Sequence, residues 1–197
     1  MTFVEGFYSF NLEITHPDSG VYEKLRLKTP RHPYESLQYL YARMLAFVHA
    51  FRPGQVFSRG LFEPDEPTLW MKDAAGSVLF WGQVGCPPAQ KLKKALNSWP
   101  DSRFSVYFFE PLQIEQFCLQ LRGSRCNWVA PVSFYCIRPD CLEQLIPLSR
   151  SSSSWQCTRV DGTLYLVVDD HEVQTEIFGI DIWNQYQLEL QKTVNGV

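Results

Sequence analysis

Alternation of apolar and polar residues predicts β-strands at both ends of the chain. Residues 3–14 and 21–28 alternate and flank the turn cluster 16–20, which predicts a hairpin. Lys24, Arg26 and Lys28 should share one face of the second strand, because side chains along a strand point to alternate faces. The first hairpin is therefore expected to present a basic face.

The C-terminal part shows a second set of strand signals. Asp161-Gly162 is a strong signal for a two-residue turn between strands expected at 155–161 and 163–168. A last strand is expected at about 172–178, followed by a polar tail. The serine run 151–154 favours a loop or a linker before these strands.

A helical pattern follows the first hairpin. Apolar residues recur at helical spacing from Leu37 to Val48, and we expect the helix to open at Pro33 with Glu35 in its first turn. An acid there interacts favourably with the helix dipole. Alanines occupy the opposite stripe, so the helix is apolar nearly all round. Such a helix is packed on two sides and belongs at the centre of the fold.

The middle of the chain mixes strand and helix patterns. Residues 56–62 lead into a hairpin expected from strands 68–72 and 77–84. Further strands are expected at 104–109 and 132–137, and helices from Pro87-Pro88 onwards and at 111–122 and 140–146. This order lacks the regular βαβ alternation of a doubly wound fold. It predicts an α/β fold of mixed α+β type, with a mixed sheet flanked by helices and extra β-hairpins.

Composition narrows the class of protein. The 197 residues are 45% hydrophobic and 20% charged, which supports one domain with a sizeable core and excludes global disorder. No apolar run approaches the roughly 18 residues of a membrane helix, and the N-terminus does not read as a signal peptide. The six cysteines include no CxxC pair and mostly have apolar neighbours. We therefore expect buried, reduced thiols in a cytoplasmic protein with no membrane partner.

The net charge of −3 conceals two segments of opposite charge. Residues 21–59 carry seven basic and two acidic residues, a net charge of +5, whereas residues 161–190 carry seven acidic and no basic residues. Clustered basic residues are the electrostatic footprint of phosphate binding, so the first segment suggests DNA or RNA as a partner. The alternative is a solvated strand face directed at the acidic segment of the same molecule.

The motifs of dinucleotide, P-loop, α/β-hydrolase and zincin sites are missing from the sequence. The best candidate chemistry is acidic. Asp65 precedes a predicted strand and Gln83 lies in the next one, so a hairpin can bring the two side chains together. Phosphodiester hydrolysis with a divalent ion needs such converging oxygen ligands and a nearby cation. The alternative is that the Pro-Asp-Glu-Pro turn is a solvated loop.

Five short motifs occur in an order and spacing that resemble the YaeQ family of bacterial proteins. They are Arg31-His32-Pro33-x-Glu35, Phe57-Ser58-Arg59-Gly60-Leu61, Asp65-Glu66-Pro67-x-x-Trp70, Trp81-x-x-x-Gly85-x-Pro87 and Lys93-Lys94-Ala95. The resemblance implies a fold similar to the PD-(D/E)XK nuclease superfamily, the restriction-endonuclease-like fold, with a central mixed sheet flanked by helices. It implies a single domain, 1–197, with a core at about 31–137 and a β-rich extension at about 155–180.

The resemblance also implies ligands for a metal ion. Asp65 would be the acid of the Pro-Asp element, Gln83 would occupy the position of the second acid, and Glu35 would lie in the first core helix. Asp65, with Glu35 or Gln83, would hold Mg²⁺ or Mn²⁺. Gln83 departs from the pattern, because an amide oxygen can bind a metal but brings no charge.

The lysine of the superfamily motif has no counterpart at its usual place, where this chain has Gly85. Lys91 or Lys94, in the following helix, is the candidate substitute. The apolar face of that helix, centred near Leu92 and Ala95, turns Lys94 towards solvent. Lys91 or Lys93, which flank that face, should reach the edge of the sheet more easily than Lys94.

Two functions follow from these features. The first is a divergent or degenerate Mg²⁺-dependent phosphodiesterase that acts on nucleic acid. The alternative is a non-catalytic module that binds nucleic acid or an unknown protein and has lost the metal site. Nucleic acid would contact Lys24, Arg26, Lys28, Arg31 and Arg59. The last of these would either touch phosphate or pair with Asp65 or Glu66.

Overall fold

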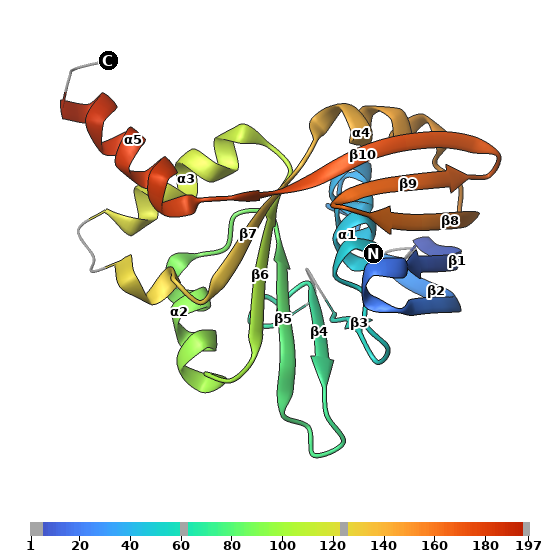
Figure 1. The fold of residues 1–197 in the computed structure, drawn as a ribbon, viewed down its shortest axis with the longest axis horizontal. Helices are drawn as coiled ribbons and strands as arrows, with labels where there is room; N and C mark the ends of the chain where they lie inside the picture. The colour runs from blue at the N-terminus through green and yellow to red at the C-terminus, as the bar shows by residue number, and fades with distance from the viewer. Residues whose placement is uncertain (1–5, 60–62, 123–125, 195–197) are drawn as a thin grey trace.

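The computed structural model describes residues 6–59, 63–122 and 126–194. In this part of the chain, ten strands form one mixed sheet in the order β2-β1-β8-β9-β10-β7-β6-β5-β4-β3 (Figure 1). The strands are β1 (Gly6–His16), β2 (Val21–Arg31), β3 (Val56–Phe57), β4 (Leu69–Lys72), β5 (Val78–Val84), β6 (Arg103–Phe108), β7 (Val132–Ile137), β8 (Ser152–Val160), β9 (Thr163–Val168) and β10 (His171–Ile180). The helices are α1 (Leu37–Ala50), α2 (Ala89–Ser98), α3 (Pro111–Leu121), α4 (Pro139–Leu145) and α5 (Ile182–Val194). The predicted mixed α+β class is confirmed.

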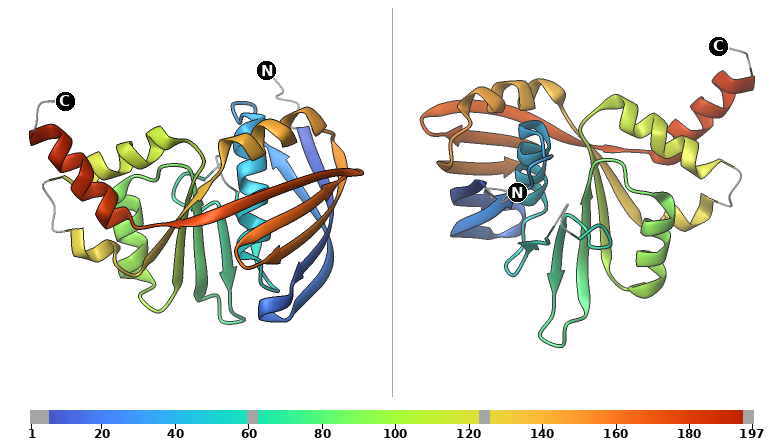
Figure 2. Two further views of the ribbon diagram at one scale, coloured as in Figure 1. Left: turned by 45° about the horizontal axis from the view of Figure 1, so that its top comes forward. Right: turned by 180° about the vertical axis from the view of Figure 1, so that it is seen from behind.

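The sheet is strongly curled and nearly closes around α1 (Figure 2). Every residue of α1 from Leu40 to Ala50 is buried. One core cluster joins this helix to Phe10 of β1 and Trp155 of β8 on one side, and to Phe80 of β5 on the other. The predicted central helix, packed on two sides, is therefore confirmed.

Helix α1 begins four residues later than predicted. Ser36 caps it, because its Oγ accepts a hydrogen bond from the backbone N–H of Tyr39 at 3.0 Å. Residues 32–35 form a turn instead, closed by the bond from Glu35 N to His32 O at 2.8 Å. The prediction that Glu35 lies in the first helical turn is wrong, because the serine cap starts the helix after it.

A second core lies on the outer face of β5, β6 and β7. Strand residues such as Phe104, Val106 and Phe108 pack there against Leu92 of α2 and Phe117 of α3. These strands therefore contribute one face to each core. The parallel strands β5 and β6 run side by side, and only residues 85–88 separate the end of β5 from the start of α2.

The three predicted hairpins are confirmed. Strand β1 pairs antiparallel with β2, β4 with β5, and β8 with β9. Residues 56–62, which were expected only to lead into the β4–β5 hairpin, contain the short strand β3 at Val56–Phe57, and residues 60–62 lie outside the described part. One further pairing was not predicted, because its strands lie far apart in the sequence. Strand β1 runs parallel to β8, with Ser9 opposite Ser152.

Two expectations for the C-terminal part are wrong. The serine run is not a loop, because Ser152, Ser153 and Ser154 open β8 and pair with β1. The predicted polar tail contains α5, which buries Ile182 and Tyr186 in the second core. Spacing of four residues brings these two apolar side chains onto one helical face.

Five of the six cysteines are free thiols, as expected: Cys86, Cys118, Cys136, Cys141 and Cys157. All except Cys86 are buried, and burial raises the pKa of Cys118 and Cys141 to about 11. Such thiols are protonated and unreactive at neutral pH. Among the described residues, no helix has both the length and the apolarity needed to cross a membrane.

Candidate functional site

A cavity of about 240 Å³ lies at the carboxyl end of β5. Its lining joins the start of α1, the segment before β4, the end of β5 and the start of α2. The residues are Tyr39, Pro64, Glu66, Pro67, Thr68, Gln83, Pro88 and Lys91. The carboxyl ends of parallel strands are where α/β sheets commonly bind ligands.

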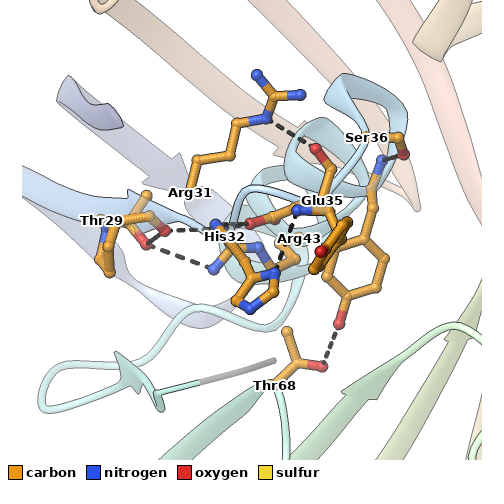
Figure 3. Close-up of polar contacts among 10 residues, drawn as sticks. Thr29, Arg31, His32, Glu35, Ser36, Arg43 and Thr68 are labelled. Carbon is orange, nitrogen blue, oxygen red and sulfur yellow. Dashed lines mark hydrogen bonds and ion pairs between the residues drawn. The ribbon is translucent and has the colours of Figure 1, made fainter. Parts of the chain in front are cut away.

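Thr68 is the central hydrogen-bonding residue of this cavity. Leu69 pairs with Gly82 across the β4–β5 hairpin, which brings the residue before it beside Gln83. The Thr68 hydroxyl oxygen accepts bonds from Val84 N at 3.0 Å and from Gln83 Nε2 at 3.2 Å. It also lies 3.3 Å from the hydroxyl of Tyr39 (Figure 3). Thr68 thus fixes the amide of Gln83 with its oxygen free to face α2.

Lys91 meets that oxygen. Its ammonium donates to Gln83 Oε1 at 3.2 Å and to the backbone oxygen of Glu66 at 2.6 Å. Burial lowers the pKa of Lys91, and the carboxylates of Asp65 and Glu66 oppose that shift. Lys94 points to solvent from α2. Of the two lysines expected to reach the edge of the sheet, Lys91 does so, whereas Lys93 is exposed like Lys94.

Gly85 explains why the lysine comes from α2. Its φ is +83°, and its N–H donates to Tyr107 O at 2.8 Å. A lysine with this backbone conformation would be strained, because its Cβ disfavours the left-handed region. A cation can therefore reach Gln83 more easily from the next helix than from this position.

Glu35 is buried, and its partner is Arg43 of α1 (Figure 3). The carboxylate lies 2.6 Å from Arg43 Nη2 and accepts the N–H of His32 at 3.1 Å. Burial raises the pKa of Glu35, and Arg43 opposes the shift. Neither Glu35 nor Arg43 lines the cavity; the guanidinium carbon of Arg43 lies 5.9 Å from the ring centroid of Tyr39, which does.

In the acidic turn before β4, one carboxylate is exposed to solvent and the others contact Arg59. Asp65 is exposed at the turn. The Glu66 carboxylate accepts the backbone N–H of Arg59 at 3.0 Å, and the Arg59 side chain pairs with Glu63 at 3.0 Å. Of the pairs predicted for Arg59, the contact with Glu66 is made through the backbone N–H, whereas the ion pair of its side chain is with Glu63.

The side-chain oxygens of Asp65, Gln83 and Glu35 form a poor binding site for a hard divalent ion. Such an ion needs several charged oxygens at one point, and Gln83 offers a neutral oxygen already bonded to an ammonium. Glu35 is held by Arg43. Within the described residues, no three His, Cys, Asp or Glu side chains are placed to hold a metal ion together.

Comparison with known families identifies the chain. A family model described as "YaeQ protein" matches residues 1–177. The chain belongs to the YaeQ family. It is 26% identical to the YaeQ protein of Salmonella typhi over 159 residues, which is 81% of this chain and 86% of that protein. It is 23% identical to the YaeQ protein of Escherichia coli K12 over 170 residues, which is 86% and 92% of the two chains. Both are described as "uncharacterized".

Solved structures of YaeQ proteins share the fold. The YaeQ protein of Xanthomonas axonopodis pv. citri matches with a TM-score of 0.79 at 24% identity, over 89% of this chain and 98% of that chain. The protein from Pseudomonas syringae matches with a TM-score of 0.77 at 24% identity, over 89% and 96% of the chains. At this identity the likeness establishes the fold alone.

The predicted nucleic-acid contacts of this YaeQ-family chain fall into two groups. Lys24, Arg26 and Lys28 are exposed on one face of β2, opposite Leu25 and Leu27, which confirms their predicted shared face. Their neighbours come from β1: Glu13 lies 2.7 Å from Lys24, and Ser9 lies 3.2 Å from Arg26.

Arg31 and Arg59 are occupied elsewhere. Arg31 donates to the backbone oxygen of Glu35 at 2.8 Å, and Arg59 lies beside the cavity turn. The basic patch is therefore the β2 triplet of Lys24, Arg26 and Lys28.

Sequence reasoning missed Tyr39 and Thr68, whose hydroxyls meet in the cavity. The available signal for Thr68 was a polar residue between Pro67 and Leu69, the buried first residue of β4. Tyr39 was missed because it lies in a helix whose apolar residues predict core packing.

Proposed function

We propose that this YaeQ-family protein is a nucleic-acid-binding module that keeps a nuclease-like fold and does not cleave its ligand. The observation that carries the proposal is the ammonium of Lys91, 3.2 Å from Gln83 Oε1 and 2.6 Å from Glu66 O. A fixed monovalent cation stands at the oxygens that a divalent ion would need. We also propose that the protein is located in the cytoplasm.

The β2 triplet supplies the binding surface in this proposal. It lies on an edge strand of the sheet, so a long ligand can approach without obstruction from a neighbouring strand. The Lys24–Glu13 pair is exposed on both sides, 77% and 50%, and such pairs contribute only about 0–1 kcal/mol. Phosphate can therefore replace Glu13 as the partner of Lys24 at little cost.

Binding is tested by fluorescence anisotropy with labelled single-stranded DNA, duplex DNA and RNA over a range of salt concentrations. Changing Lys24, Arg26 and Lys28 together to Glu should abolish binding, and single changes should lower the salt slope by roughly 0.7–0.9 per lost phosphate contact. The matched control is Lys93→Glu with Lys94→Glu, two exposed lysines of α2. Equal binding by both variants, or no binding by the wild type, would overturn the proposal and favour a protein partner.

Cleavage is tested separately. The wild type is incubated with plasmid, single-stranded DNA and RNA in the presence of Mg²⁺ or Mn²⁺, and intact substrate is expected. Cleavage that disappears in Asp65→Ala would contradict the non-catalytic proposal. Lys94→Ala is the control, because that side chain points to solvent.

A divergent Mg²⁺- or Mn²⁺-dependent phosphodiesterase is the second candidate. One observation favours it: Asp65 and Glu66 both act on the pKa of Lys91, so acids and a lysine gather near Gln83. This candidate requires cleavage that depends on the added ion and on both Asp65 and Lys91. Cleavage that survives Asp65→Ala would exclude it.

A further inference from the structure

A second cavity, of about 150 Å³, lies at the carboxyl end of α1, away from Tyr39 and the first cavity. Three arginines line it from three separate parts of the chain: Arg52 after α1, Arg103 at the start of β6, and Arg159 near the end of β8. His49 and Tyr107 form its inner wall, with Nδ1 of the histidine 3.0 Å from the phenol oxygen. We call the side chains of Arg52, Arg103 and Arg159 the arginine cluster.

Neutral groups hold the arginine cluster in place. Arg159 Nη1 donates to the backbone oxygen of His49, and Arg52 Nη1 donates to that of Phe51 at 2.8 Å. Arg103 lies over the ring of Phe80, 4.6 Å from its centroid. Each guanidinium has five N–H groups, so these contacts leave donors available. They position the side chains without neutralising them.

Negative charge near the arginine cluster is scarce. No acidic residue lines the cavity, and within the described residues none of the three arginines forms an ion pair with a carboxylate. The helix end offers only about half an elementary charge. Asp18 acts on Arg159 from a distance. Repulsion within the cluster adds to burial in lowering the pKa of Arg103 and of Arg159.

We propose that the arginine cluster binds a phosphate group, as a free phosphate or as a terminal phosphomonoester. The planar fork of arginine matches phosphate oxygens, and three such forks converge on one concave site. The cavity, of about 150 Å³, has room for the five heavy atoms of a phosphate. The site is independent of the function proposed for the β2 triplet.

Arg103 is the residue to change, because Arg52 and Arg159 also cap α1. Isothermal titration calorimetry with inorganic phosphate, at constant ionic strength, measures affinity for the wild type, Arg103→Gln and Arg103→Lys. The loss of one charged donor should weaken binding about tenfold or more, and lysine should restore part of it because it keeps the charge. Arg138→Gln is the control, since that exposed arginine pairs with Asp140 outside the cavity. Circular dichroism of each variant without ligand reports its fold.

Two oligonucleotides of one sequence, with a 5′-phosphate or a 5′-hydroxyl, distinguish the sources of the phosphate. Tighter binding of the phosphorylated form, lost in Arg103→Gln, supports a nucleic-acid end as the ligand. Binding of inorganic phosphate alone supports a small phosphate. Absence of both, or equal affinity in the wild type and a folded Arg103→Gln, overturns the site. Loss of binding at the β2 triplet can be told apart, because changes to Lys24, Arg26 and Lys28 should weaken the binding of both oligonucleotides equally.

Discussion

The carboxylate of Glu35 is buried, and its partner decides what it does. Only 3% of its side chain and 4% of that of Arg43 are exposed, and the two groups lie 2.6 Å apart. Burial favours the neutral acid, whereas Arg43 and the N–H of His32 favour the ionised form. We assign the ionised pair, because an unpaired buried guanidinium would be far more costly. Glu35 therefore joins the turn before α1 to the helix itself.

Removal of one partner of this pair should expose that cost. Glu35→Leu should lower the free energy of unfolding by about 3–5 kcal/mol, because it leaves Arg43 buried and uncompensated. Adding Arg43→Met should recover much of the loss. Urea unfolding measures both variants. Glu63→Ala, at the exposed pair with Arg59, is the control and should cost at most about 1 kcal/mol. A Glu35→Leu loss no larger than the control would contradict the assignment.

His16 and His49 make stability depend on pH. Burial, followed by the charge of Arg159, lowers the pKa of His16 to about 4 and that of His49 to about 3. Both histidines titrate near 6.5 when unfolded, so between these values the unfolded chain binds more protons. Their contribution is complete above pH 6.5 and is lost as the pH falls towards 4 and then 3. Asp18 opposes the shift at His16 only weakly.

The measurement is urea unfolding at a series of pH values from neutral to acidic. His16→Gln should flatten the decline in unfolding free energy below pH 6.5, since the variant has no proton to take up there. His171→Gln, at an exposed position, should leave the slope unchanged. An unchanged slope in His16→Gln would show that other groups govern acid stability.

Helix α1 shows what sequence patterns predict well at the scale of an element. Apolar residues on all its sides predicted two packing partners, and both halves of the sheet supply them. The start of the helix was misplaced because Pro33 and Ser36 both suit helix beginnings, and only the bond to Tyr39 N selects the serine. Helix α5 was missed because only Ile182 and Tyr186 of its first turns are buried. Asp181 is a helix-capping residue type that could have indicated the start of α5. Its carboxylate accepts the N–H of Asn184 at 3.0 Å.

Close packing around α1 predicts low tolerance for larger side chains. Ala46 is completely buried in the curled sheet. Ala46→Leu should destabilise the protein by about 1–3 kcal/mol or more, because the extra carbons must displace neighbours on both sides. Lys94→Leu, which adds a leucine to the exposed side of α2, is the control and should lie within about 0.5 kcal/mol of the wild type. Chemical denaturation of both variants gives the comparison, and equal values would contradict the two-sided packing.

At the scale of the whole molecule, contacts between distant segments carry what the sequence did not predict. The parallel pairing of β1 with β8 joins the first hairpin to the C-terminal strands. The same arrangement gathers Arg52, Arg103 and Arg159 around one cavity. No local pattern marks residues that meet only when the sheet curls. Gln83 and Lys91, by contrast, meet across one short connection, and their proximity could be inferred from strand and helix geometry.

The two cores should unfold together. Strand β6 places Tyr107 in the core around α1 and Val106 and Phe108 in the core beneath α2 and α3, so neither core survives without the strand. Leu121→Ala in α3 should lower stability by about 2–5 kcal/mol. In a single cooperative unit, hydrogen exchange of slow amides in α1 must speed up by the same free energy as those in α3. Leu142→Ala, in the core around α1, should act on α3 reciprocally. Faster exchange confined to the mutated core would show two independent units and refute the single domain.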